Sequence, residues 1–253
     1  MKKLLIVLIF SFVPGVIAAQ EDQGQQIIQL HKYNYFHPYT YTTSERDAGQ
    51  RSELKYQFSF RIALLGSGSR SALFLAYTQK SVWQIYDRDN SRPFRSTDYN
   101  PEVFYRTGGK TFYGDFGYAH ESNGREDPTS RSWDTLFLKL KFTIPSFDIS
   151  LKTWYILGED QNKGDIFPEK REPIVDFFGY NELALTLKGD YFFWAHKARY
   201  NFSTKNGSYE TNLSLPLSSR FFLTFQYFFG YGDTLLDYNQ STNRYGLGIM
   251  LNR

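Results

Sequence analysis

A histidine and a serine stand two residues apart, at His120 and Ser122, and a carboxylate follows at Asp134. Serine, histidine and aspartate act as nucleophile, general base and orienting residue in many acyl-transfer enzymes. The residues between Ser122 and Asp134 are rich in turn formers, so the chain can reverse there. The spacing therefore suggests nucleophilic catalysis, provided that the flanking segments point the three side chains to the same side.

The segments on both sides of this turn alternate, so that every second residue lies on one face. His120 and Ser122 continue the uncharged face of the first segment, and Asp134 begins the apolar face of the second. The apolar members of these two faces are Phe112, Phe116, Tyr118, Leu136, Leu138, Leu140 and Phe142. If the hairpin pairs symmetrically about Asp127, His120 lies opposite Asp134, with Cβ atoms about 4.5–5.5 Å apart.

The same alternation recurs along the chain and predicts an all-β fold, a 12-stranded antiparallel transmembrane β-barrel. The strands are expected at 33–42, 53–65, 71–84, 102–107, 111–122, 132–144, 147–157, 179–187, 191–202, 208–215, 220–230 and 244–252. Short and long connections alternate between them, as in outer-membrane barrels. Aromatic residues make up 19% of the chain, which fits a lipid-facing exterior.

Residues 1–19 have the pattern of a secretory signal peptide, with Lys2 and Lys3 before an apolar run and small residues at its end. We therefore expect an exported protein with a single barrel domain over residues 20–253. The chain has no cysteine, which excludes disulfides and thiol catalysis. Without residues 1–19 the chain is almost neutral, so nucleic acid is not expected as a partner.

The face of the barrel wall on which the three residues lie decides which ester the hypothetical triad would meet. A soluble ester would enter from the lumen or a cleft, whereas a nucleophile on the outer wall meets lipid. The predicted reaction is acyl transfer from a phospholipid, with Ser122 as nucleophile, His120 as base and Asp134 as orienter.

The sequence 120–125, His-Glu-Ser-Asn-Gly-Arg, followed by Asp-Pro-Thr-Ser-Arg-Ser-Trp at 127–133, resembles the signature of Gram-negative outer-membrane phospholipase A. The resemblance extends through 78–81, 93–95 and 230–239. It implies a calcium-dependent enzyme of the outer membrane, multi-pass and active as a homodimer, that hydrolyses phospholipid acyl esters with A1, A2 and lysophospholipase activity.

Carried over by position, the resemblance implies that Gly124 donates its amide to the oxyanion. It also implies Ca²⁺ ligands in the Arg125 carbonyl, the Ser130 hydroxyl and Ser91 of the partner subunit, and a contact between subunits at Gln79. From spacing alone, Ser91 and Ser130 are typical turn formers. The alternation of faces alone places Gln79 on the outside, where a polar residue of the membrane interface is as good an interpretation as a contact between subunits.

One residue departs from the resembled family, which has asparagine where this chain has Asp134. A carboxylate can still accept a hydrogen bond from the imidazole and stabilise its protonated form. Two other functions remain open at this point. One is a non-enzymatic outer-membrane barrel, either a narrow pore or a structural protein, and the other is a secreted β-sandwich lipase.

Overall fold

The computed structural model describes residues 28–44, 50–66, 71–126, 128–158 and 173–251. The expected signal peptide, 1–19, lies outside these described residues. In chain order the strands are β1 (Ile28–Leu30), β2 (Asn34–Thr42), β3 (Ser52–Leu65), β4 (Ser71–Trp83), β5 (Phe94–Gly108), β6 (Phe112–Ser122), β7 (Ser132–Ile144), β8 (Phe147–Ile156), β9 (Asn181–Gly189), β10 (Phe192–Tyr200), β11 (Gly207–Pro216), β12 (Phe221–Gly230) and β13 (Thr242–Leu251). One helix, α1 (Ile174–Phe178), precedes β9.

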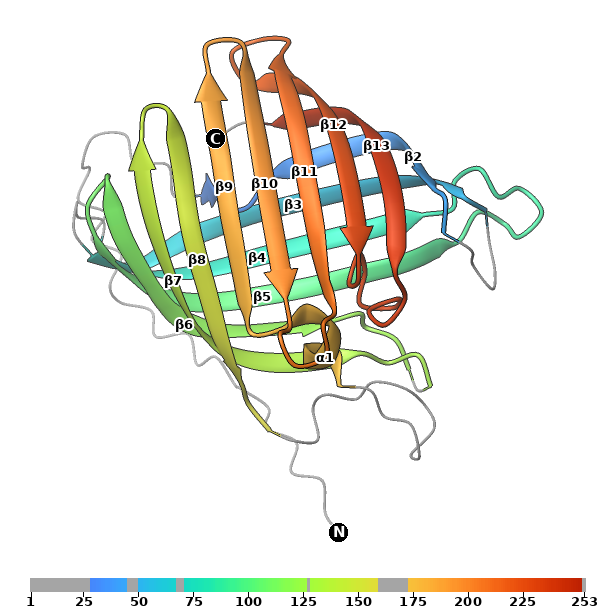
Figure 1. Cartoon of the computed structure of the whole chain (residues 1–253), viewed down its shortest axis with the longest axis horizontal. Coiled ribbons are helices and arrows are strands. Elements are labelled where there is room, and N and C mark those ends of the chain that lie inside the picture. Colours follow the sequence, from blue (N-terminus) through green and yellow to red (C-terminus); the bar gives the residue numbers. More distant parts are fainter. Residues whose placement is uncertain (1–27, 45–49, 67–70, 127, 159–172, 252–253) are drawn as a thin grey trace, which may run out of the picture.

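The strands close into an antiparallel barrel, because β13 pairs with β2 and, from β2 to β13, each strand pairs with the next one along the chain (Figure 1). The short β1 and the longer β2 both pair with β3, so they are two pieces of one wall strand interrupted at 31–33. The 13 strands thus occupy the twelve predicted wall positions, and the predicted barrel is confirmed.

The connections differ in length at the two ends of the barrel. The short ones, which we call the turn side, join β3 to β4, β5 to β6, β7 to β8, β9 to β10 and β11 to β12. The other end, the loop side, carries the longer connections, of which the one between β10 and β11 is the shortest. The predicted alternation of connection lengths is therefore confirmed.

Three segments differ from the sequence-based prediction. The residues 94–101 belong to β5 and not to a loop, because their inward side chains are polar, like most of the barrel interior, and lack an apolar rhythm. A short helix, α1, lies between the strands expected at 147–157 and 179–187, where no helix was expected. The residues 28–30 form β1, although the first strand was expected to begin at residue 33.

The wall has an apolar outside and a polar inside. Outward side chains such as Phe116, which is 60% exposed, form the outer surface, whereas Lys55, Glu53 and Arg244 are buried inside. A cavity of about 550 Å³ remains in the interior, lined by charged and aromatic side chains. Among the described residues, no helix combines the length and apolar character needed to cross a membrane.

Two structures fill the loop side of the interior. The helix α1 and the connection between β12 and β13 lie at this end of the barrel (Figure 1). Phe177 of α1 contacts the rings of Tyr231 and Tyr238, and Phe178 packs edge-on against Trp133. Tyr238 is completely buried.

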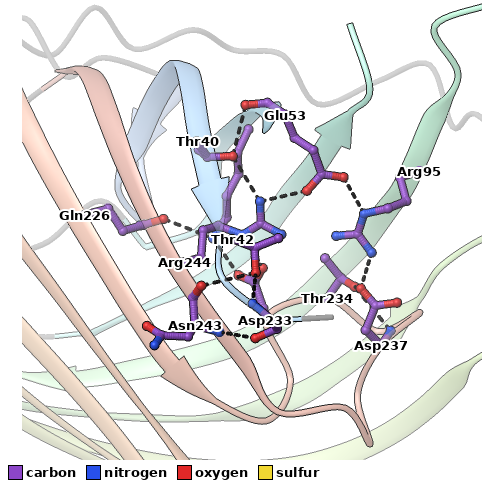
Figure 2. A network of polar contacts seen from close by, with 12 residues as sticks. Thr40, Thr42, Glu53, Arg95, Gln226, Asp233, Thr234, Asp237, Asn243 and Arg244 are labelled. Carbon is purple, nitrogen blue, oxygen red and sulfur yellow. Dashed lines mark hydrogen bonds and ion pairs between the residues drawn. The ribbon is translucent and has the colours of Figure 1, made fainter. Parts of the chain in front are cut away.

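An ionic network, which we call the mouth network, lies beside this packing and consists of Lys55, Arg95, Arg244, Glu53, Asp233 and Asp237. Arg244 stands between two carboxylates, 2.7 Å from Glu53 and 2.6 Å from Asp233 (Figure 2). Burial by itself would raise the pKa of the Asp233 carboxyl, but Arg244 and Lys55 hold that pKa well below its usual value.

Candidate active site

The hairpin of β6 and β7 places His120 directly opposite Asp134, and Nδ1 of His120 lies 2.8 Å from Oδ1 of Asp134. A carboxylate only accepts hydrogen bonds, so Nδ1 carries the proton and donates it to Asp134. The lone pair of the neutral imidazole is then on Nε2, ready to accept a proton from a nucleophile. The predicted pairing of His120 with Asp134 is confirmed.

The pair lies on the outer wall of the barrel, near its loop side. The His120 side chain is 35% exposed and that of Asp134 is 14% exposed. Their neighbours on the same face, Tyr118 and Leu136, are exposed apolar-bodied residues. The predicted outward direction of this face is therefore confirmed, and the imidazole is accessible from the surface on which lipid would lie.

Ser122 continues the outer face two residues beyond His120 and lies opposite Ser132. It is half-buried. Within the described residues its hydroxyl makes no hydrogen bond, so the contact between Ser122 and His120 is not formed in this structure. Contacts between nucleophile and base are often longer before substrate binds. The fold thus joins the base to Asp134 and keeps the serine on the strand and face of the base.

The connection after Ser122 is held by Asn123, which is 4% exposed. Its Oδ1 accepts from the amides of Arg125 (3.3 Å) and Arg131 (2.9 Å), and its Nδ2 donates to the Thr129 carbonyl (2.8 Å). One buried amide thereby satisfies both ends of the connection. The sequence showed Asn123 only as part of a turn, and its role in holding the turn is a finding of the structure.

Gly124 follows with a φ of 61°, in the left-handed region that favours glycine. A Cβ atom there would lie 2.8 Å from the ring of Tyr99 on β5. Both the backbone angle and the close ring therefore favour glycine. Among the described residues the Gly124 amide donates no hydrogen bond, so it is available to another acceptor.

The predicted metal ligands lie on two loop-side connections. Arg125 and Ser130 belong to the one between β6 and β7, whereas Ser91 belongs to the one between β4 and β5 and has a φ of 59°. The Arg125 guanidinium donates to the Arg95 carbonyl at 2.5 Å. Among the described residues, neither the Arg125 carbonyl oxygen nor the Ser130 hydroxyl makes a hydrogen bond.

These free oxygens fit a hard cation such as calcium. Both oxygens are neutral, and calcium takes about 6–8 oxygen ligands, so a calcium site here would need further ligands. In the part of the chain that the structure describes, no cluster of three histidine, aspartate or glutamate side chains could hold a metal.

Gln79 lies on the outer face of β4, as its parity predicts, and has polar partners on its own strand. Its Oε1 accepts from the Tyr77 hydroxyl at 3.1 Å, and its Nε2 donates to the Ser81 hydroxyl at 3.2 Å. Each end of the amide therefore has one partner within the chain, two residues away on either side, and one further hydrogen-bonding position.

Tyr118 is a contact of the site that the sequence analysis did not single out. Its hydroxyl donates to Oδ1 of Asp134, the same atom that His120 contacts. Leu136 is the direct partner of Tyr118, so the contact with Asp134 is diagonal across the hairpin. Aromatic side chains reach such diagonal neighbours. The predicted register, which pairs His120 with Asp134, could have indicated this contact, because it also places Tyr118 diagonally to Asp134.

Comparison with known proteins gives consistent matches. The sequence profile of the phospholipase A1 family matches residues 16–251. The phospholipase A1 of Salmonella typhimurium is 36% identical over 222 residues, which cover 84% of this chain and 73% of the relative. That of Escherichia coli K12 is 37% identical over 213 residues, which cover 80% of this chain and 71% of the relative.

Solved structures agree with these sequence matches. The outer membrane phospholipase A of Escherichia coli superposes with a TM-score of 0.80 at 32% identity, over 89% of this chain and 98% of that one. The Salmonella typhi outer membrane phospholipase, a dimer with bound calcium, gives a TM-score of 0.79 at 32% identity, over 89% of this chain and 92% of that one.

Proposed function

This chain belongs to the phospholipase A1 family, and we propose that it is a calcium-dependent outer-membrane phospholipase A whose triad of Ser122, His120 and Asp134 cleaves acyl esters of phospholipids. The observation that carries the proposal is the hydrogen bond between His120 and Asp134 on the outer wall. It gives a general base the correct tautomer on the surface that contacts lipid.

In the proposed reaction, Oγ of Ser122 attacks the ester carbonyl while Nε2 of His120 takes the serine proton. The protonated imidazole is stabilised by Asp134, and the oxyanion accepts from the Gly124 amide. Proton return from His120 releases the lysophospholipid alcohol and leaves the acyl group on Ser122. Water, deprotonated by His120, then frees the fatty acid and restores the serine.

The outward position of the triad supports membrane phospholipid as the substrate. Acyl esters lie at the polar boundary of a bilayer, and the site lies near the loop-side end of an apolar wall. A site open to lipid can take either acyl chain, as well as a lysophospholipid. We therefore include A1, A2 and lysophospholipase activity in the proposal.

Calcium is proposed to be held by the Arg125 carbonyl, the Ser130 hydroxyl and Ser91 of the partner subunit. The Arg125 and Ser130 oxygens, which make no hydrogen bond among the described residues, and the calcium in the related Salmonella typhi dimer support this ligand set. When bound, calcium would add positive charge near the developing oxyanion. A ligand from a second chain would make the homodimer the active form, with Gln79 at the contact between subunits.

The proposed location is the outer membrane of a Gram-negative bacterium, with the strands as multiple passes. Residues 1–19 would direct export as a signal peptide, and residues 20–253 would form one barrel domain. The apolar exterior of the barrel supports this location, as do the relatives known as outer membrane phospholipases.

The rival hypothesis of a non-enzymatic pore is less well supported. The mouth network and the packing of α1 against Tyr238 fill the loop side of the interior, where a pore needs an open path. A β-sandwich lipase is excluded, because the strands close into one barrel.

Removal of calcium tests the proposal. Purified protein in phospholipid–detergent mixed micelles is expected to release fatty acid with calcium, and to lose the activity by at least about a hundredfold in excess chelator, the scale of a lost oxyanion stabiliser. Titration with calcium should restore the activity in parallel with cross-linked dimer. Magnesium, which holds its water more tightly, serves as the control ion. Full activity in chelator would refute the calcium site.

Asp134→Asn tests the least usual member of the triad. The carboxamide oxygen can still accept from Nδ1 of His120, so we expect the variant to retain activity within about tenfold of the original, the loss of one charge-assisted hydrogen bond. Initial rates at saturating calcium measure it. A thousandfold loss would show instead that the reaction depends on the carboxylate charge.

A further inference from the structure

One hydroxyl and one imidazole of β6 converge on one carboxylate oxygen. Tyr118 and His120 lie two residues apart on the outer face, and both contact Oδ1 of Asp134 on β7. The tyrosine hydroxyl can only donate to a carboxylate, so Oδ1 accepts two hydrogen bonds. Tyr118 thus contacts the group that orients the proposed base, from the side away from Ser122.

A carboxylate on a lipid-facing wall is energetically unfavourable unless donors surround it. The Asp134 side chain is only 14% exposed, so water reaches it poorly. Leu157, which directly follows β8, donates its backbone amide to the Asp134 carbonyl and not to the side chain. Within the described residues, the Asp134 carboxylate therefore has two hydrogen-bond donors, His120 and the hydroxyl of Tyr118.

We propose that Tyr118 is a positioning residue of the triad: its hydroxyl holds the Asp134 carboxylate turned toward His120, on a face of the wall that meets lipid. This inference rests on the proposed function. Hydrogen bonds from O–H to a carboxylate are about twice as strong as those between neutral groups. The contribution of Tyr118 should therefore depend on the charge of residue 134, which a purely structural role would not.

The test compares Tyr118→Phe in two backgrounds, the original chain and Asp134→Asn. Phenylalanine retains the ring on the outer wall and removes only the hydroxyl. The matched control is Tyr105→Phe on the neighbouring β5, because Tyr105 also faces outward, opposite Phe116, and its hydroxyl has no partner among the described residues. Circular dichroism in detergent verifies that each variant forms the barrel.

In the original background we expect Tyr118→Phe to lower kcat about tenfold, the loss of a charge-assisted hydrogen bond, with KM for phospholipid changed less than about twofold. In the Asp134→Asn background the same substitution should lower kcat by no more than about threefold, because a neutral carboxamide needs the donor less. Tyr105→Phe should leave kcat unchanged.

Three results would overturn the inference: an equal loss in both backgrounds, a loss below about twofold in the original background, or a fall as large in Tyr105→Phe. The proposed function fails separately. If Ser122→Ala still releases fatty acid, the triad itself is wrong, whereas an inactive Ser122→Ala beside a fully active Tyr118→Phe refutes only the role of Tyr118.

Discussion

Ser122→Ala is expected to slow fatty-acid release at least about a thousandfold, because no other group in the proposed mechanism can form the acyl-enzyme. The loss should appear in kcat, since the outer wall that meets the lipid is unchanged. The measurement is fatty acid released from phospholipid–detergent mixed micelles at saturating calcium. Fatty-acid release by the original chain, together with its loss in Ser122→Ala, distinguishes an enzyme from the non-enzymatic barrel.

A matched control exists on the facing strand. Ser132 lies directly opposite Ser122 and points to the same outer face, yet the proposed mechanism does not use it. Ser132→Ala should therefore retain most of the activity, which shows that losing a hydroxyl from this hairpin is not by itself harmful. If Ser122→Ala hydrolyses phospholipid as fast as the original chain, the proposed nucleophile is wrong.

The second large effect concerns stability. Arg244→Ala removes the central cation of the mouth network, which lies within hydrogen-bonding distance of Glu53, Asp233 and Thr40. Arg244 is completely buried, so the two carboxylates would keep an uncompensated negative charge away from water. Breaking a buried ion pair from one side costs about 3–5 kcal/mol of unfolding free energy. Guanidinium unfolding in detergent micelles, followed by tryptophan fluorescence, measures the change.

The exposed Arg220, on the turn side, provides the control, because Arg220→Ala should change the unfolding free energy by less than about 0.5 kcal/mol. A double variant distinguishes charge from packing. Replacing Arg244 by methionine together with Glu53→Gln removes one charge of each sign and leaves Lys55 with Asp233 and Arg95 with Asp237, so it should recover much of the loss. An Arg244→Ala variant as stable as the original chain would contradict a structural role for the network.

The alternating pattern was sufficient to predict the barrel and the site hairpin. Side chains on a strand alternate strictly between two faces, so His120, Ser122 and Asp134 were assigned to the apolar outside from their parity alone. The pairing of His120 with Asp134 followed from symmetry about Asp127, and the structure has that register. The roles of these residues in catalysis remain predictions for the variants above to test.

The same pattern failed where the interior is polar. Ser96 and Asp98 face inward in β5, so this stretch looked like a loop although it is paired throughout with β4. The helix α1 was missed for another reason, because its five residues are too few to show a helical period. Its apolar side chains are buried against Trp133 and Tyr238, which are distant in sequence.

The amino-acid sequence by itself determined which face of each strand meets lipid, and hence where a triad could lie, because the two-residue period needs no knowledge of distant contacts. Only the tertiary structure decided which charges meet inside the barrel and which hydroxyl reaches Asp134. Arg244 and Glu53 are 191 positions apart, and Tyr118 reaches Asp134 diagonally across the hairpin. Such contacts depend on barrel closure and side-chain reach, which no local pattern specifies.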